Sequence, residues 1–168
     1  MADSKPVVGV VMGSESDMEI MQRCCDQLEK FGIAYEVRII SAHRTPDVAH
    51  EYSATAADRG LKVIIAAAGL SAALPGILAA NTNLPIIGVP IDSGPLRGVD
   101  SALSIMQMPP GVPVACMAIG KAGATNSAVY AAELLALVDS RLADELKGHK
   151  VSQAKKVAEK DASIRKRD

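Results

Sequence analysis

Three residues that could do chemistry together lie in the segment SAHRTP, which begins at Ser41. Histidine is the side chain whose ordinary pKa is nearest neutrality, so His43 is suited to proton transfer. Arginine offers a planar, permanently charged fork for phosphate, so we predict that Arg44, with Ser41, binds an anionic substrate. Thr45 before Pro46 predicts an N-cap followed by proline at the first helical position. The alternative is a surface loop whose His43 and Arg44 only meet water.

A second segment, MGSESD, has the composition of a phosphate-binding turn. Gly13 permits a tight turn, and Ser14, Ser16 and the free N–H groups of a helix start can hold a phosphate. Asp17 would then accept hydrogen bonds from ribose hydroxyls. The alternative is that Ser16 and Asp17 only cap the helix, since Ser16 with Glu19 matches a capping box.

Two further loops, AGLSAALPG and DSGPLRGVDS, are rich in small and polar residues. We predict that the first, with Gly69 and Ser71, leaves room for a flat ring and a small gas-like fragment, while Leu70 and Leu74 exclude water. Ser71 lacks the GxSxG context of a hydrolase nucleophile. The sequence has no zinc-ligand spacing, no GxxxxGK[ST] and no strand-initiated GxGxxG, so we expect neither a metal nor a cofactor.

These loops follow apolar, β-branched runs at residues 7–11, 37–40, 63–68, 85–91 and 112–119. Runs that are apolar nearly throughout indicate strands buried on both faces, as in a parallel sheet covered by helices. Helical patterns alternate with them at residues 16–31, 46–59, 75–81, 99–107 and 125–147. The order predicts an α/β fold, a three-layer α/β/α sandwich with a five-stranded parallel sheet of the flavodoxin-like kind, whose ligands bind beyond the carboxyl ends of the strands.

The chain length and charge limit the remaining possibilities. With 168 residues, we expect a single catalytic domain at residues 1–147 and a charged helical tail with a frayed end at residues 148–168. A net charge of -1 gives no general reason to bind nucleic acid or an anionic membrane. The apolar run after the N-terminus is too short for a spanning helix or a typical signal peptide, so we expect a cytoplasmic protein.

Several reactive side chains are expected to have no catalytic role. The three cysteines match neither a disulfide framework nor a CxxC metal site, so we expect them to be reduced core residues. His50 and His149 share no loop with the other reactive groups. Lys121, before the last helix, is expected to be an exposed lysine, and the alternative is that it gives cationic support to the site.

Several segments together carry a resemblance to a known family. In order along the chain, they are VMGSESD, SAHRTPD, the LPG of AALPG, GVP, GVDSALSIMQMP, GVPVA and AIGKAGATNSA. In sequence and spacing they resemble the N5-carboxyaminoimidazole ribonucleotide mutases and the related aminoimidazole ribonucleotide carboxylases. The resemblance covers nearly the whole chain. It implies that Ser14, Asp17 and Arg44 bind the ribonucleotide and that His43 is the general acid/base. It also implies an isomerase that needs no cofactor, assembles as a homo-octamer and couples functionally to an ATP-dependent carboxylating enzyme.

The chemistry that the resemblance implies belongs to de novo purine biosynthesis. Carbon dioxide leaves the N5 carbamate of the substrate and is recaptured at C4 of the same imidazole, and His43 removes the C4 proton to give 4-carboxy-5-aminoimidazole ribonucleotide. The alternatives are a lyase that uses free CO2, a carboxylase of another ring, and a non-catalytic nucleotide-binding module. A phospho-receiver is disfavoured because residues 66–68 are all alanine, without the carboxylate it requires.

The third loop departs from the mutase pattern. Mutases normally carry GGAAHLPG, whereas residues 69–76 read GLSAALPG and place Ala73 where a histidine is expected. The carboxylase branch resembles this loop, with an early serine and no histidine, but it usually has SAHK where this chain has Arg44. Arg44, the QMP of residues 107–109 and the GKAGA stretch favour the mutase.

Overall fold

A five-stranded parallel sheet forms the centre of the protein, and the computed structural model describes residues 5–165. The strands are paired in the order β2-β1-β3-β4-β5. Their bounds are β1 (Val8–Met12), β2 (Tyr35–Ile39), β3 (Val63–Ala68), β4 (Ile86–Pro90) and β5 (Ala115–Cys116). Every residue of β1, β3 and β4 is buried, as their continuous apolar runs predict. The predicted parallel sheet and flavodoxin-like order are confirmed.

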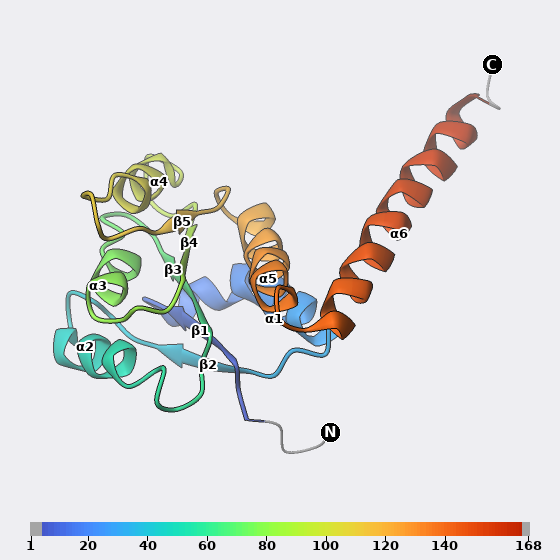
Figure 1. The fold of residues 1–168 in the computed structure, drawn as a ribbon. Helices are drawn as coiled ribbons and strands as arrows, with labels where there is room; N and C mark the ends of the chain where they lie inside the picture. The colour runs from blue at the N-terminus through green and yellow to red at the C-terminus, as the bar shows by residue number, and fades with distance from the viewer. Residues whose placement is uncertain (1–4, 166–168) are drawn as a thin grey trace. The chain divides into compact units, whose positions relative to one another are not determined.

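Helices cover both faces of the sheet. Their bounds are η1 (Glu15–Asp17), α1 (Met18–Lys30), α2 (Pro46–Ala54), α3 (Leu74–Ala80), α4 (Val99–Met106), α5 (Lys121–Ala136) and α6 (Ser140–Arg165). Helices α2, α3 and α4 lie on one face, and α1 with the beginning of α5 lies on the other (Figure 1). The predicted three-layer sandwich is therefore confirmed.

Each face has its own apolar core. On the side of α2, α3 and α4, a cluster of buried side chains includes Tyr52, Ile64, Leu78 and Ile105. Burying an aliphatic side chain of this size contributes about 1.5–3 kcal/mol. On the other side, the Ser127 hydroxyl of α5 donates to Cys24 Sγ of α1 at 3.5 Å.

The cysteines behave as core residues. Cys24 and Cys25 are buried, Cys116 is half-buried, and all three are free thiols. Burial raises the pKa of the Cys24 thiol to about 12, so it stays protonated and unreactive at neutral pH.

The order of the strands determines where a ligand can bind. Strand β1 lies between β2 and β3. The chain therefore passes from β1 to β2 on one side of β1, and the connection after β2 returns to β3 on the opposite side of β1. In open α/β sheets this reversal opens a crevice beyond the carboxyl ends of the strands. The loops that follow β1, β2 and β3 meet there.

The helix predicted at residues 125–147 is wrong in its extent. The structure has two helices instead, α5 and α6, with a break at residues 137–139. Asp139 Oδ1 accepts a hydrogen bond from Leu142 N at 3.2 Å, which caps the start of α6. Aspartate competes for backbone N–H groups in this way, so it favours a helix start over a helix interior.

The last strand, β5, has two residues and is much shorter than the strand predicted at residues 112–119. Pro113 has no N–H to donate to a ladder. Met117 N donates to Gly88 O and Gly120 N to Pro90 O, both at 2.8 Å, which holds the chain near β4 beyond the strand.

The chain divides into two compact units, residues 1–131 and 132–168. In the second unit, α6 carries exposed side chains throughout residues 151–165. Pairs such as Arg165 with Asp161, at 3.1 Å, support it. The predicted frayed end reaches residues 166–168, outside the described residues, and the predicted domain boundary at residue 147 stays a prediction. No helix within residues 5–165 is both long and apolar enough to cross a membrane.

Candidate active site

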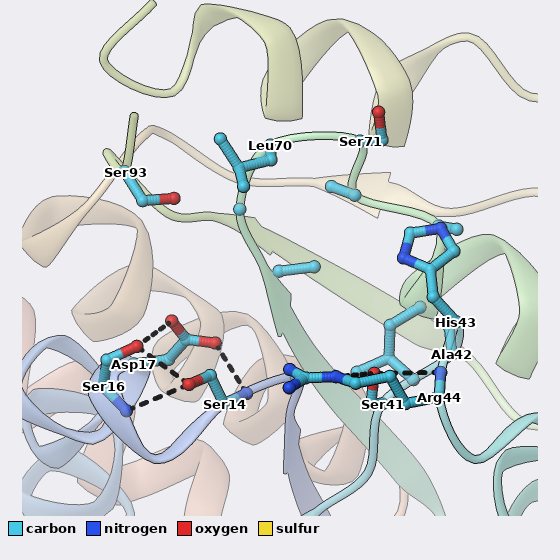
Figure 2. A pocket seen from close by; sticks show the side chains of 16 residues that line it. Ser14, Ser16, Asp17, Ser41, Ala42, His43, Arg44, Leu70, Ser71 and Ser93 are labelled. Atoms are coloured by element: carbon cyan, nitrogen blue, oxygen red, sulfur yellow. Dashed lines mark hydrogen bonds between the residues drawn. The ribbon is translucent and has the colours of Figure 1, made fainter. Parts of the chain in front are cut away.

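A cavity of about 480 Å³ lies where the loops after β1, β2 and β3 meet (Figure 2). All the residues predicted for the site line it, from three different loops: Ser14, Ser16, Asp17, Ser41, His43, Arg44, Gly69 and Ser71. Because parallel strands deliver their following loops to one edge, segments about 60 residues apart in the sequence become neighbours.

The loop after β1 is held by a capping box. Ser14 N donates to Asp17 Oδ2 at 3.2 Å, and Ser14 Oγ accepts from Ser16 N at 3.4 Å. Ser16 Oγ also donates to Ser14 Oγ at 3.0 Å. The box predicted between Ser16 and Glu19 is therefore wrong, because Ser14 is the N-cap of η1 and Asp17 is its acidic partner.

Asp17 is a buried carboxyl at the base of the cavity, with 7% of its surface exposed. Burial raises its pKa, and hydrogen bonds from Ser14 N, the Ser16 hydroxyl and Gly13 N oppose that rise. These donors occupy part of its acceptor capacity. Since Asp17 also lines the cavity, its remaining lone pairs can accept hydrogen bonds from a ligand hydroxyl.

The loop after β2 is closed by Thr45. Thr45 N and Thr45 Oγ1 both donate to Ser41 O, at 2.8 and 2.9 Å, and Ser41 N donates to Thr45 Oγ1 at 3.1 Å. Thr45 occupies the predicted N-cap position before Pro46, but its side chain bonds no N–H group of α2. The side chain instead shapes the loop that carries His43 and Arg44.

Arg44 is oriented by the same serine. Its backbone N and its Nε both donate to Ser41 Oγ at 3.3 Å. The guanidinium then extends toward Ser14, across the floor of the cavity (Figure 2). Its terminal nitrogens face the serine-rich turn, where a phosphate could receive a bidentate contact from Arg44 and further hydrogen bonds from the turn.

His43 extends from the same loop toward the segment that carries Ser71 (Figure 2). The side chain is exposed, and within residues 5–165 no group hydrogen-bonds to its ring. Both ring nitrogens are therefore open to a ligand. An apo catalytic histidine often gains its hydrogen bonds only when substrate binds.

The loop after β3, residues 69–73, forms the upper wall of the cavity and is called the cover loop below. Leu74, just after it, is 2% exposed and belongs to the core, whereas Leu70 is 52% exposed at the rim. Ala73, half-buried, lines the cavity and is the N-cap residue of α3. Leu74 is thus part of the core and Leu70 lies at the mouth, and their predicted role in excluding water stays a prediction.

Four cavity residues were not singled out from the sequence as site residues: Ala42, Ala68, Ala72 and Ser93. Ser93 lines the cavity from the loop after β4, and Ala42 lines it between Ser41 and His43. Ser93 belongs to the polar segment DSGPLRGVDS, and that composition was the available signal. The residues given no role are outside the cavity: His50 bonds Asn81 Oδ1 at 2.7 Å, and Lys121 is exposed, 3.8 Å from Glu19.

The cavity has one end rich in hydrogen-bond donors and another end that carries a histidine. Ser14, Ser16 and Arg44 supply donors at one end, and His43 stands at the other beneath the cover loop (Figure 2). Among residues 5–165 no three His, Cys, Asp or Glu side chains are grouped to hold a metal ion. The side chains present suit acid/base chemistry on a bound phosphorylated ligand.

The fold and the site thus define a flavodoxin-like α/β protein with a pocket lined by serine, aspartate, histidine and arginine side chains at the carboxyl edge of its sheet. Residues 7–156 match the family described as AIR carboxylase. The chain is 55% identical over 142 residues to the N5-carboxyaminoimidazole ribonucleotide mutase of Bacillus subtilis, covering 84% of this chain and 88% of that protein. It is 52% identical over 151 residues to the mutase of Pseudomonas aeruginosa, covering 90% and 93%.

The solved structures agree. The crystal structure of Treponema denticola PurE matches with a TM-score of 0.81 at 34% identity, covering 94% of this chain and 98% of that one. A Dictyostelium discoideum protein named bifunctional purine synthesis protein purC/E is 55% identical over 133 residues, which are 79% of this chain and 13% of that protein. The chain belongs to the AIR carboxylase family.

Proposed function

We propose that this protein is an N5-carboxyaminoimidazole ribonucleotide mutase, an isomerase of de novo purine biosynthesis that forms 4-carboxy-5-aminoimidazole ribonucleotide. The observation that carries the proposal is the pairing of His43 and Arg44 on one loop, with both side chains lining the same cavity as Ser14 and Asp17. The relatives at 55% and 52% identity bear that mutase name.

Binding begins at the phosphate end of the cavity. Arg44 pairs with the phosphate, and Ser14 and Ser16 donate to it near the start of η1. Asp17 accepts from the ribose hydroxyls, because a buried carboxylate beside the phosphate itself would repel it. This arrangement directs the imidazole toward His43 and the cover loop, where Gly69 and Ser71 contact it.

The reaction breaks one bond and forms another on the same ring. The N5–carboxyl bond cleaves and N5 takes a proton from His43 acting as an acid, which gives CO2 and aminoimidazole ribonucleotide; C4 then attacks the CO2. His43 removes the C4 proton, which restores the aromatic ring, and the net change transfers one proton from C4 to N5. A positioned acid/base group typically accelerates such a step about 100-fold to 10,000-fold. Holding the CO2 beside its acceptor replaces an encounter in solution.

The competing activity is a carboxylase, a lyase that uses free CO2. Ala73 is the feature that favours it, because this small side chain lines the cavity where the mutase pattern has a histidine. Arg44 supports the mutase instead, since the carboxylase branch usually has a lysine at this position. A protein that binds the ribonucleotide without turnover is the third possibility.

The resemblance extends the proposal to the protein's surroundings. We propose that the protein is cytoplasmic, assembles as a homo-octamer, handles CO2 as an intermediate, and receives its substrate from an ATP-dependent carboxylating enzyme. The bifunctional purine synthesis protein of Dictyostelium, which contains a matching segment, supports coupling to other steps of purine synthesis.

The test supplies the purified protein separately with the N5 carbamate and with aminoimidazole ribonucleotide plus dissolved CO2. Formation of the C4 carboxylate mainly from the carbamate supports the mutase. Efficient formation from free CO2 would replace the mutase with the carboxylase. Ligand binding with no product from either mixture would leave only the binding module.

A further inference from the structure

Two loops at the rim of the cavity fit into each other at paired glycines. A Cβ atom added to Gly69 in the cover loop would collide with Ser93 Oγ of the loop after β4. A Cβ atom added to Gly94 in that second loop would lie 2.5 Å from Leu70 Cδ2 of the cover loop. Each loop therefore places a side chain in the space that a glycine of the other leaves open.

The backbone of the cover loop is held in an unusual conformation. Leu70 has a φ of 55°, in the left-handed region that a leucine rarely adopts. Leu70 also leaves 52% of its surface exposed. A strained, exposed apolar side chain persists where its neighbours determine its position, and such residues gather at functional sites.

The paired contacts lie directly beside the cavity. Leu70, Gly69 and Ser93 all line it, and Leu70 and Ser93 face each other across its upper rim (Figure 2). The same cover loop continues through Ser71 to Ala73, the segment above His43. Anchoring the loop at Gly69 and Leu70 therefore determines how closely its remainder covers the histidine.

We propose that Ser93 and Leu70 are positioning residues that hold the cover loop over His43 and so retain the CO2 released from the carbamate. This inference rests on the proposed mutase function. After the N5–carboxyl bond has cleaved, CO2 either bonds to C4 or escapes. Escape leaves aminoimidazole ribonucleotide, with N5 protonated, as a side product. The fraction of this side product measures how well the loop covers the site.

The test exchanges the sizes of the paired residues. Gly69→Ala introduces a methyl group into the space of the Ser93 side chain, and Ser93→Gly vacates that space. Each variant, the double variant and the wild type receive the N5 carbamate, and both ribonucleotide products are measured together with Tm. Gly148→Ala is the matched control, because a Cβ at this helical glycine meets nothing within 4 Å.

We expect Gly69→Ala to lower kcat/KM about tenfold and to raise the fraction of aminoimidazole ribonucleotide several-fold. The double variant should recover most of both losses, because the added methyl group then has space. Leu70→Ala, at an exposed position, should raise the side-product fraction with Tm unchanged within about 2 °C. Gly148→Ala should match the wild type.

The results separate this inference from the proposed function. A wild type that forms the C4 carboxylate, with a double variant no better than Gly69→Ala, would overturn the positioning role alone. An unchanged side-product fraction in Leu70→Ala and Gly69→Ala would do the same. A wild type that makes no C4 carboxylate from the carbamate would overturn the mutase function itself, and the inference with it.

Discussion

Replacing Thr45 with valine should weaken the site although Thr45 does not line the cavity. Valine keeps the β-branched shape but loses the hydroxyl, and with it the bonds to Ser41 N at 3.1 Å and Ser41 O at 2.9 Å. The backbone bond from Thr45 N to Ser41 O at 2.8 Å remains. The loop should therefore loosen without unfolding, and Ser41 should orient Arg44 less well.

The size of the effect follows from the two lost hydrogen bonds. A net hydrogen bond contributes about 0.5–1.5 kcal/mol, and exposure of Thr45 places these in the lower half of that range. Together they amount to about 1.5 kcal/mol, which corresponds to about a tenfold loss in kcat/KM. We expect most of it in KM, because Arg44 is the phosphate-binding group.

Steady-state kinetics with the N5 carbamate, alongside Tm, check this prediction. Thr45→Ser is the control, because serine retains the hydroxyl and should stay within about threefold of the wild type. The reasoning is refuted by a Thr45→Val variant with wild-type kinetics, or by equal losses in Thr45→Val and Thr45→Ser.

Three further changes test other parts of the site and fold. Arg44→Lys keeps the charge but loses the fork, so KM should rise about tenfold in the same kinetic assay while kcat changes less. Leu78→Ala removes a fully buried side chain and should lower the free energy of unfolding in urea by about 2–5 kcal/mol. Asp17 has a raised pKa when folded, so its ionisation costs stability as pH rises through and above its ordinary value of 3.8. Asp17→Asn removes this cost. The free energy of unfolding of this variant relative to the wild type should therefore increase from about pH 3.8 upward and level off above the raised pKa of folded Asp17, whereas a pH-independent difference in urea titrations would contradict the reasoning.

Most of the cavity lining was predictable from the sequence because its residues cluster in short polar loops directly after apolar strands. Parallel topology alone then brings His43, Asp17 and Gly69 to one edge. The capping box was ambiguous, since Ser14 with Asp17 and Ser16 with Glu19 share the same spacing. Only the start of η1 in space decides between them.

Features that depend on contacts between loops were beyond the sequence. Nothing local to Ser93 indicates that it occupies the space beside Gly69, and a leucine such as Leu70 ordinarily avoids positive φ. The short β5 and the helix break at Asp139 were missed for a different reason. Both regions are apolar enough to extend an element, but Pro113 and the capping aspartate interrupt the backbone hydrogen bonds.

The most direct measurement of the central claim is turnover by His43→Asn, together with calorimetric binding of aminoimidazole ribonucleotide. Because the His43 ring is exposed and makes no hydrogen bond within residues 5–165, the fold and the phosphate end should be unaffected. The account predicts a Kd within about threefold of the wild type and a kcat lower by at least about 100-fold. Turnover close to that of the wild type, with binding intact, would contradict the role of His43 in proton transfer.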